Sequence, residues 1–89
     1  MSFPSTGNPD FWARYYKLPE GVRRLARKTY RLWEAEPFHP SLHFKKVGTE
    51  NWSVRVGIHY RAMGKFVEGR FLWEWIGTHD EYDRLAGKG

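Results

Sequence analysis

The chain has 89 residues, a formal net charge of +5 and no cysteine. This length predicts one small domain over residues 1–89, and the lack of cysteine excludes disulfides, thiolate nucleophiles and cysteine-type zinc sites. No apolar run is long enough to span a membrane and no secretory signal is recognisable at the N-terminus, which favours a cytoplasmic protein. A basic small domain is typical of nucleic-acid and phosphate binders, although many basic proteins bind neither.

The first half of the chain predicts two helices. Asn8 is a plausible N-cap with Pro9 in the first turn, and Pro19 begins a second helix. From there apolar residues recur every 3.6 positions until Pro37 ends the pattern. We therefore predict an αα-hairpin from about 9 to 36, preceded by at most a weak strand near residue 3. The outer face of the second helix is basic and carries Arg23, Arg24, Arg27, Lys28 and Arg31.

The second half of the chain predicts three strands. SLHFKKVG reads as a short strand, and NWSVRVGIHYRAMG alternates apolar and polar residues as one long strand would. A turn is expected from Gly64 to Gly69, with RFLWEWIG as the third strand in an antiparallel hairpin. Both faces of RFLWEWIG are largely apolar, so the sequence does not predict which of the two is buried.

A capping box then opens a short C-terminal helix. Thr78 and Glu81 have the spacing in which each side chain caps the other's backbone. The predicted class is α+β: an N-terminal αα-hairpin packed on a small twisted antiparallel β-sheet, followed by a short C-terminal helix.

The polar face of the long predicted strand is the first candidate site. Arg55, His59 and Arg61 share this face, and we expect the Arg61 side chain to face solvent while Val56 faces the core. Arginine suits phosphate because its planar fork donates two hydrogen bonds and stays charged. The alternative is an ordinary solvated strand face.

The C-terminal stretch is the second candidate site. His79 and Tyr82 are three residues apart, on one helical face, and either side chain can transfer a proton if cations lower the pKa of the tyrosine. The alternative is that Tyr82 packs on the core and Asp80 and Asp83 are solvated. No zinc spacing is present apart from His39 and His43 around a proline, so we expect neither a metal nor a cofactor.

Three stretches in order, HPSLHFKKV, WSVRVGIHYRAMG and WEWIGTHDEYDRL, resemble the RelE/ParE family of bacterial type II toxin–antitoxin toxins. The resemblance covers about residues 8 to 86. It implies two helices against a twisted antiparallel sheet and a cognate antitoxin protein that covers the site. For the RelE-like branch it implies metal-independent cleavage of mRNA on the ribosome, by attack of a 2′-hydroxyl on the adjacent phosphate.

The resemblance also implies roles for individual residues. Arg61 matches the strand arginine of the family's YR motif, Arg55 an earlier basic residue, and His79 and Tyr82 the C-terminal pair. The residues expected to contact RNA or the ribosome are Lys45, Lys46, His59 and His43, with His39 a weaker candidate. The glutamate base of some members is missing from this strand face, where Glu74 on the next strand is the nearest acid.

Three functions follow as hypotheses. The first is a toxin that acts as an endoribonuclease on mRNA, with Arg55 and Arg61 on the scissile phosphate and His79 or Tyr82 moving protons. The second is a ParE-like inhibitor that binds DNA gyrase without cleaving RNA. The third is a plain RNA-binding module with aromatic stacking surfaces.

Overall fold

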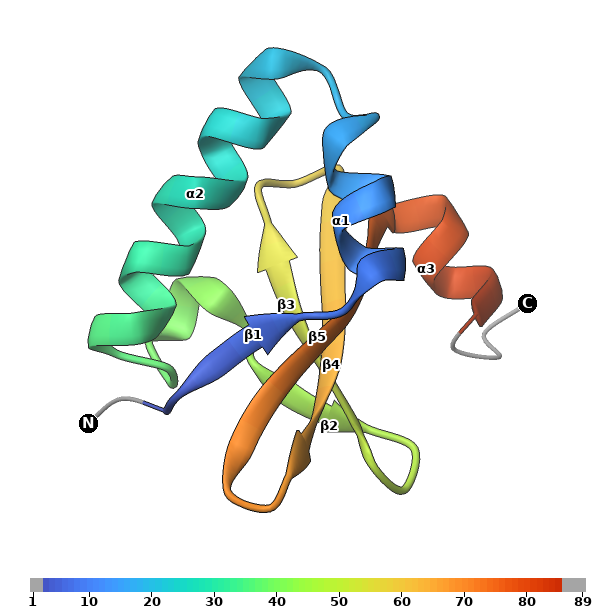
Figure 1. Cartoon of the computed structure of the whole chain (residues 1–89). Coiled ribbons are helices and arrows are strands. Elements are labelled where there is room, and N and C mark those ends of the chain that lie inside the picture. The colour runs from blue at the N-terminus through green and yellow to red at the C-terminus, as the bar shows by residue number, and fades with distance from the viewer. Residues whose placement is uncertain (1–2, 86–89) are drawn as a thin grey trace.

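A computed structural model describes residues 3–85. It has three α-helices, one 3₁₀ turn (η1) and a five-stranded sheet (Figure 1). In chain order the elements are β1 (Ser5–Gly7), α1 (Pro9–Tyr16), α2 (Glu20–Ala35), η1 (Pro40–Leu42), β2 (Lys45–Val47), β3 (Asn51–Val56), β4 (Tyr60–Val67), β5 (Arg70–Thr78) and α3 (His79–Leu85). This confirms the predicted α+β class.

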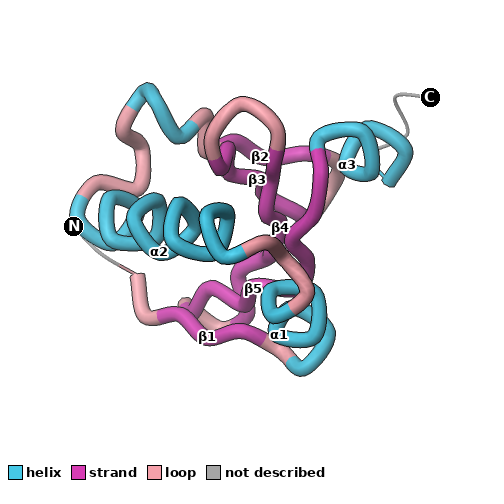
Figure 2. Tube along the Cα trace, turned by 90° about the horizontal axis from the view of Figure 1, so that it is seen from above, coloured by secondary structure: helices cyan, strands magenta, loops and turns pink. Residues whose placement is uncertain are grey.

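The sheet has the strand order β1-β5-β4-β3-β2. The predicted antiparallel arrangement holds for β2 to β5, although these are four strands where three were predicted. Strand β1 pairs parallel with β5, so the complete sheet is mixed. Seen from above, α2 and α3 lie on opposite sides of β4 (Figure 2). Among the described residues, no helix has the length and apolar character needed to cross a membrane.

Both predicted N-terminal helices are present. The Asn8 side chain accepts a hydrogen bond from the Phe11 backbone N–H and caps α1, as its sequence position predicts. Helix α1 ends at its C-cap residue, Lys17. Helix α2 begins after its N-cap residue, Pro19, and no side chain caps its first turn.

The long strand predicted over NWSVRVGIHYRAMG is wrong, because the segment folds into the hairpin of β3 and β4. Residues 57–59 form the turn, and Gly57 has a positive φ of 64° that L side chains rarely adopt. The alternation of apolar and polar residues continues unbroken through the three-residue turn, so it did not reveal the turn. Residues of one face in β3 pair with residues of the same face in β4: Arg55 with Arg61 and Val54 with Ala62. Ile58, counted as a core-facing residue, is 69% exposed at the tip of the turn.

The turn predicted from Gly64 to Gly69 is also wrong in extent, because β4 continues to Val67. The reversal takes only Glu68 and Gly69, which both have positive φ, the backbone of a two-residue type I′ hairpin turn. The predicted strand in SLHFKKVG is shorter than expected and covers only β2, after a residue in the left-handed region, His43.

The main core lies between α1, α2 and one face of the sheet. Trp33 of α2 and Phe71 of β5 are both fully buried at its centre, surrounded by other aromatic rings. Along β5 the register passes from Met63↔Trp75 to Gly64↔Trp73, so Glu74 has no partner and the facing of side chains switches there. Phe71, Trp73 and Ile76 therefore all belong to the main core, which answers the question about the faces of β5.

Candidate functional site

The candidate site lies on the face of the sheet that α1 and α2 leave uncovered. Arg55 and Arg61 are directly opposite each other on β3 and β4, and side chains of such pairs share one face. Lys45 lies opposite Ser53 on the same face. We call these four residues, Lys45, Ser53, Arg55 and Arg61, the arginine face. The hairpin thus brings the two arginines closer than the single predicted strand did.

Arg61 is buried, with 9% exposure, which contradicts the expectation that it faces solvent. Its guanidinium carbon lies 4.9 Å from the ring centre of Tyr82, a cation–π contact. Its Nη1 donates a long hydrogen bond of 3.4 Å to Ser53 Oγ, and its Nε is buried with no acceptor among the described residues. The charge is therefore held in place with a donor still free.

Ser53 is the residue that sequence reasoning missed. It is fully buried, and its Oγ accepts hydrogen bonds from both Arg61 and the Tyr82 hydroxyl, the latter at 3.2 Å. Its position in the alternating strand pattern placed it on this face, but a lone serine there gives no sign of a structural role. Ser53 orients both predicted site residues.

Arg55 is more accessible than Arg61 and contacts a histidine. Its Nε donates to the backbone oxygen of Gly57 at 3.2 Å, and its Nη1 lies 3.1 Å from Nε2 of His43. A guanidinium can only donate, so His43 accepts through Nε2 and carries its proton on Nδ1. The exposed side chain of His43, predicted only as an RNA contact, is thus part of the arginine face's rim.

The two candidate proton carriers have different environments. Tyr82 is 6% exposed and its hydroxyl is used by Ser53. His79 is half-exposed, its Nδ1 lies 3.2 Å from the Asp83 carboxylate, and its ring centre is 6.1 Å from that of Tyr82. This pairing orients the imidazole and leaves Nε2 free, which suits proton transfer better than the buried phenol.

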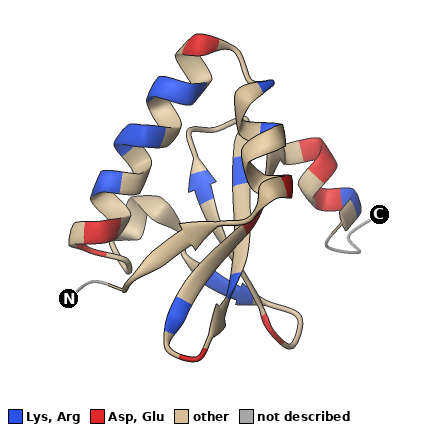
Figure 3. Ribbon diagram, in the orientation of Figure 1, with Lys and Arg blue, Asp and Glu red and all other residues tan. Residues whose placement is uncertain are grey.

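The remaining predicted residues are only partly brought together. His59 is exposed in the β3–β4 turn, and its backbone oxygen accepts from the His79 N–H at 2.7 Å. Lys46 lies opposite Trp52 and therefore on the other face of the sheet, away from the arginines. His39 instead caps η1, where its Nδ1 accepts from the Ser41 N–H. Figure 3 shows where the lysine, arginine, aspartate and glutamate residues lie in the fold.

Two acidic features lie near the site. Glu74 is paired with Lys65 at 3.6 Å, so its carboxylate already has a cationic partner. His79, Asp80 and Asp83 place ligand atoms within 4.8 Å of one another, close enough to share an ion. Exposed acidic clusters of this kind are common on protein surfaces, and His79 is already paired with Asp83. This arrangement alone assigns no metal.

Comparisons with known proteins identify structures that share this fold. No family model matches the sequence, and no curated protein matches it. Solved structures do match: isolated Escherichia coli RelE toxin, at 13% identity and a TM-score of 0.69, covers 98% of both chains. The archaeal RelE–RelB complex from Pyrococcus horikoshii matches at 19% identity and a TM-score of 0.63, covering 88% of this chain and 96% of that one. The E. coli DinJ–YafQ toxin–antitoxin complex matches at 9% identity and a TM-score of 0.67, over 91% and 97%. The chain therefore has the RelE-like fold.

Proposed function

We propose that this protein is the toxin of a type II toxin–antitoxin system and acts as a metal-independent, ribosome-dependent mRNA endonuclease. The observation that carries the proposal is the pair Arg55 and Arg61, directly opposite each other on the sheet face that α1 and α2 leave open. Two like charges facing each other weaken a sheet, so their presence there needs a compensating role. Binding of an anionic phosphate provides one.

In this proposal the 2′-oxygen of one nucleotide bonds to the adjacent phosphorus and the bond to the 5′-oxygen breaks. Arg55, the more accessible arginine, contacts the scissile phosphate together with Lys45. Arg61 adds positive charge from beneath the Tyr82 ring. One proton leaves the 2′-hydroxyl and another reaches the leaving 5′-oxygen, and His79 exchanges one of them.

The partners follow from the same proposal. The solved structures that share the fold include toxins in complex with antitoxins, RelB and DinJ. We infer that a cognate antitoxin protein inhibits this chain as well, and that mRNA on the ribosome is its substrate.

Mapping of transcript ends tests the proposal. The wild type, Arg55→Ala and a matched control, Arg24→Ala on the exposed face of α2, are induced in cells. The wild type and the control should give new, codon-phased 5′-hydroxyl ends, and Arg55→Ala should reduce them at least about 100-fold, the usual cost of a lost charge-stabilising donor.

Wild-type induction without such ends would refute the endonuclease. If purified protein then inhibits supercoiling by gyrase at stoichiometric amounts, the ParE-like alternative is favoured. Normal growth with RNA bound but intact would favour the binding module.

A further inference from the structure

His43 is an exposed residue that contacts Arg55 from a loop 12 positions earlier in the chain. It follows η1 and has a positive φ of 48°, a left-handed backbone that is uncommon for residues other than glycine. Its neighbours Leu42 and Phe44 are both buried in the core. Because these two residues anchor the loop on either side, the strained backbone between them persists and holds the imidazole beside β3.

Two neutral acceptors hold the Arg55 guanidinium. Its Nε donates to the Gly57 backbone oxygen at 3.2 Å, and its Nη1 donates to Nε2 of His43 at 3.1 Å. Gly57 also has a positive φ, of 64°, so both acceptors come from residues with a left-handed backbone. A guanidinium has five N–H groups. These two hydrogen bonds leave three of them, all on Nη1 and Nη2, for the oxygens of a phosphate.

The two acceptors fix the direction of Arg55 without neutralising its charge. Within the described part of the chain Arg55 is in no salt bridge, and the like-charged Arg61 lies directly opposite it on β4. A carboxylate in the place of His43 would pair with the guanidinium and compete with phosphate for its donors. A neutral imidazole instead orients the guanidinium and leaves its full charge for an anion.

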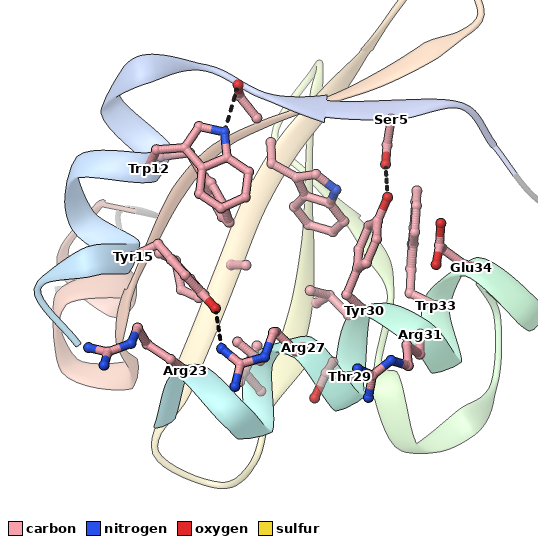
Figure 4. Close-up of a pocket in the computed structure, with 18 of the residues that line it drawn as sticks. Ser5, Trp12, Tyr15, Arg23, Arg27, Thr29, Tyr30, Arg31, Trp33 and Glu34 are labelled. Carbon is pink, nitrogen blue, oxygen red and sulfur yellow. Dashed lines mark hydrogen bonds between the residues drawn. The ribbon is translucent and has the colours of Figure 1, made fainter. Parts of the chain in front are cut away.

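This contact differs from that of Arg27, which also donates to a neutral side chain. Arg27 donates to the Tyr15 hydroxyl at 2.8 Å, beside the cavity between α1 and α2 on the opposite face of the sheet (Figure 4). A hydroxyl can turn its hydrogen away and still accept. An imidazole accepts through Nε2 only when it is neutral and carries its proton on Nδ1, so the contact with Arg55 selects one tautomer of His43.

We propose that His43 is a positioning residue for Arg55. Its neutral Nδ1–H tautomer fixes the guanidinium, so that the remaining N–H groups of Arg55 point toward the scissile phosphate. The role in cleavage rests on the proposed function, whereas the tautomer and the held guanidinium can be observed without RNA or ribosomes.

Long-range ¹H–¹⁵N spectra of the full chain test the tautomer against an internal reference. Nδ1 of His39 accepts from the Ser41 N–H at 3.1 Å, so the neutral ring of His39 carries its proton on Nε2. At mildly alkaline pH, where ordinary imidazoles are neutral, these spectra show which ring nitrogen is protonated. His39 and His43 should be opposite tautomers. The same tautomer in both would overturn the proposal.

Two substitutions separate the acceptor from the fold. His43→Gly removes the imidazole and suits the positive φ, so it should melt no lower than the wild type. The Arg55 Nε–H signal should then exchange with water about fivefold faster, the equivalent of one net hydrogen bond. His43→Gln keeps an acceptor oxygen at about the reach of Nε2 and should restore the slower exchange.

Transcript mapping connects the contact to cleavage. His43→Gly should reduce the new transcript ends about tenfold or more, because a misplaced phosphate-binding group costs rate steeply, and His43→Gln should restore most of them. The matched control is Glu68→Gly, which relieves a positive φ of 51° in the exposed β4–β5 turn and should cleave as the wild type does.

Two further results would overturn the proposal: wild-type cleavage by His43→Gly, or unchanged exchange of its Arg55 signal. If the wild type produces no new transcript ends, the proposed function fails by itself. The tautomers and the Arg55 signal then still decide whether His43 holds Arg55.

Discussion

At the scale of single residues, the two arginines differ in what surrounds them. Arg61 is clamped between the Tyr82 ring and Ser53, whereas Arg55 reaches the surface beside His43. A substitution of Arg61 therefore removes packing as well as charge. A solvent-facing Arg61, as the sequence predicted, could have been removed at little cost to the fold, but the buried Arg61 cannot.

We predict that Arg61→Ala lowers the free energy of unfolding by about 2 kcal/mol, because it leaves a cavity beneath the Tyr82 ring. Arg61→Met should stay within about 1 kcal/mol of the wild type, since an apolar side chain of similar volume can fill the site. Arg55→Ala should cost less than about 1 kcal/mol. Urea denaturation of the three variants measures this.

In the transcript assay both Arg61 variants should lose activity, so stability and activity separate at Arg61→Met. Wild-type activity in that variant would remove the Arg61 charge from the proposed mechanism.

At the scale of elements, α3 is held to the end of β5 by its capping box. The Glu81 carboxylate accepts from the Thr78 backbone N–H at 2.9 Å, and the Thr78 hydroxyl accepts from the Glu81 N–H at 3.2 Å. The backbone and side-chain hydrogen bonds from Thr78 hold the pKa of Glu81 below its ordinary value. This short helix also supplies His79 and Tyr82, so the cap positions the site.

The lowered pKa of Glu81 implies a dependence of stability on pH. The charged form is favoured in the folded state, so its contribution is present at pH values above the pKa of the unfolded carboxyl. It is lost as the pH falls through the lower folded pKa. We predict that Glu81→Gln melts below the wild type near neutral pH, by an amount equivalent to about 1 kcal/mol or less, and that the gap closes in acid.

Thermal melts over a pH series measure this gap, with Glu50→Gln in the exposed β2–β3 loop as the control. A gap that stays constant down to the most acidic pH, or an equal effect at Glu50, would contradict the assignment.

At the scale of the whole molecule, one face of the sheet carries the core and the other the site. Val56 is 2% exposed on the core face, as the alternation predicted, and Val67 is 42% exposed at the end of β4. Val56→Asp should leave no cooperative unfolding transition, because burying an unpaired carboxylate costs more than a small domain can tolerate.

Val67→Asp makes the same chemical change on the surface and should melt within a few degrees of the wild type. Circular dichroism melts of both variants measure their thermal stability. Equal losses of stability in the two variants would refute the assignment of Val56 to the core face.

The sequence by itself determined the helices, β5, the capping box and the residues available to the site. These features depend on signals within a few positions: the 3.6-residue period of α2, Asn8 before Pro9, and Thr78 three residues before Glu81. The same local reasoning misread the β3–β4 hairpin, because a three-residue turn leaves the alternation in phase and Gly57 alone did not mark it.

Only the tertiary structure decided how exposed each site residue is and what it contacts. Arg61 is buried because Tyr82, 21 positions later, packs over it, and both bond to Ser53 from another strand. His43 meets Arg55 across 12 positions. Burial and pairing arise from packing between segments distant in the chain, and no local pattern encodes which segments will meet.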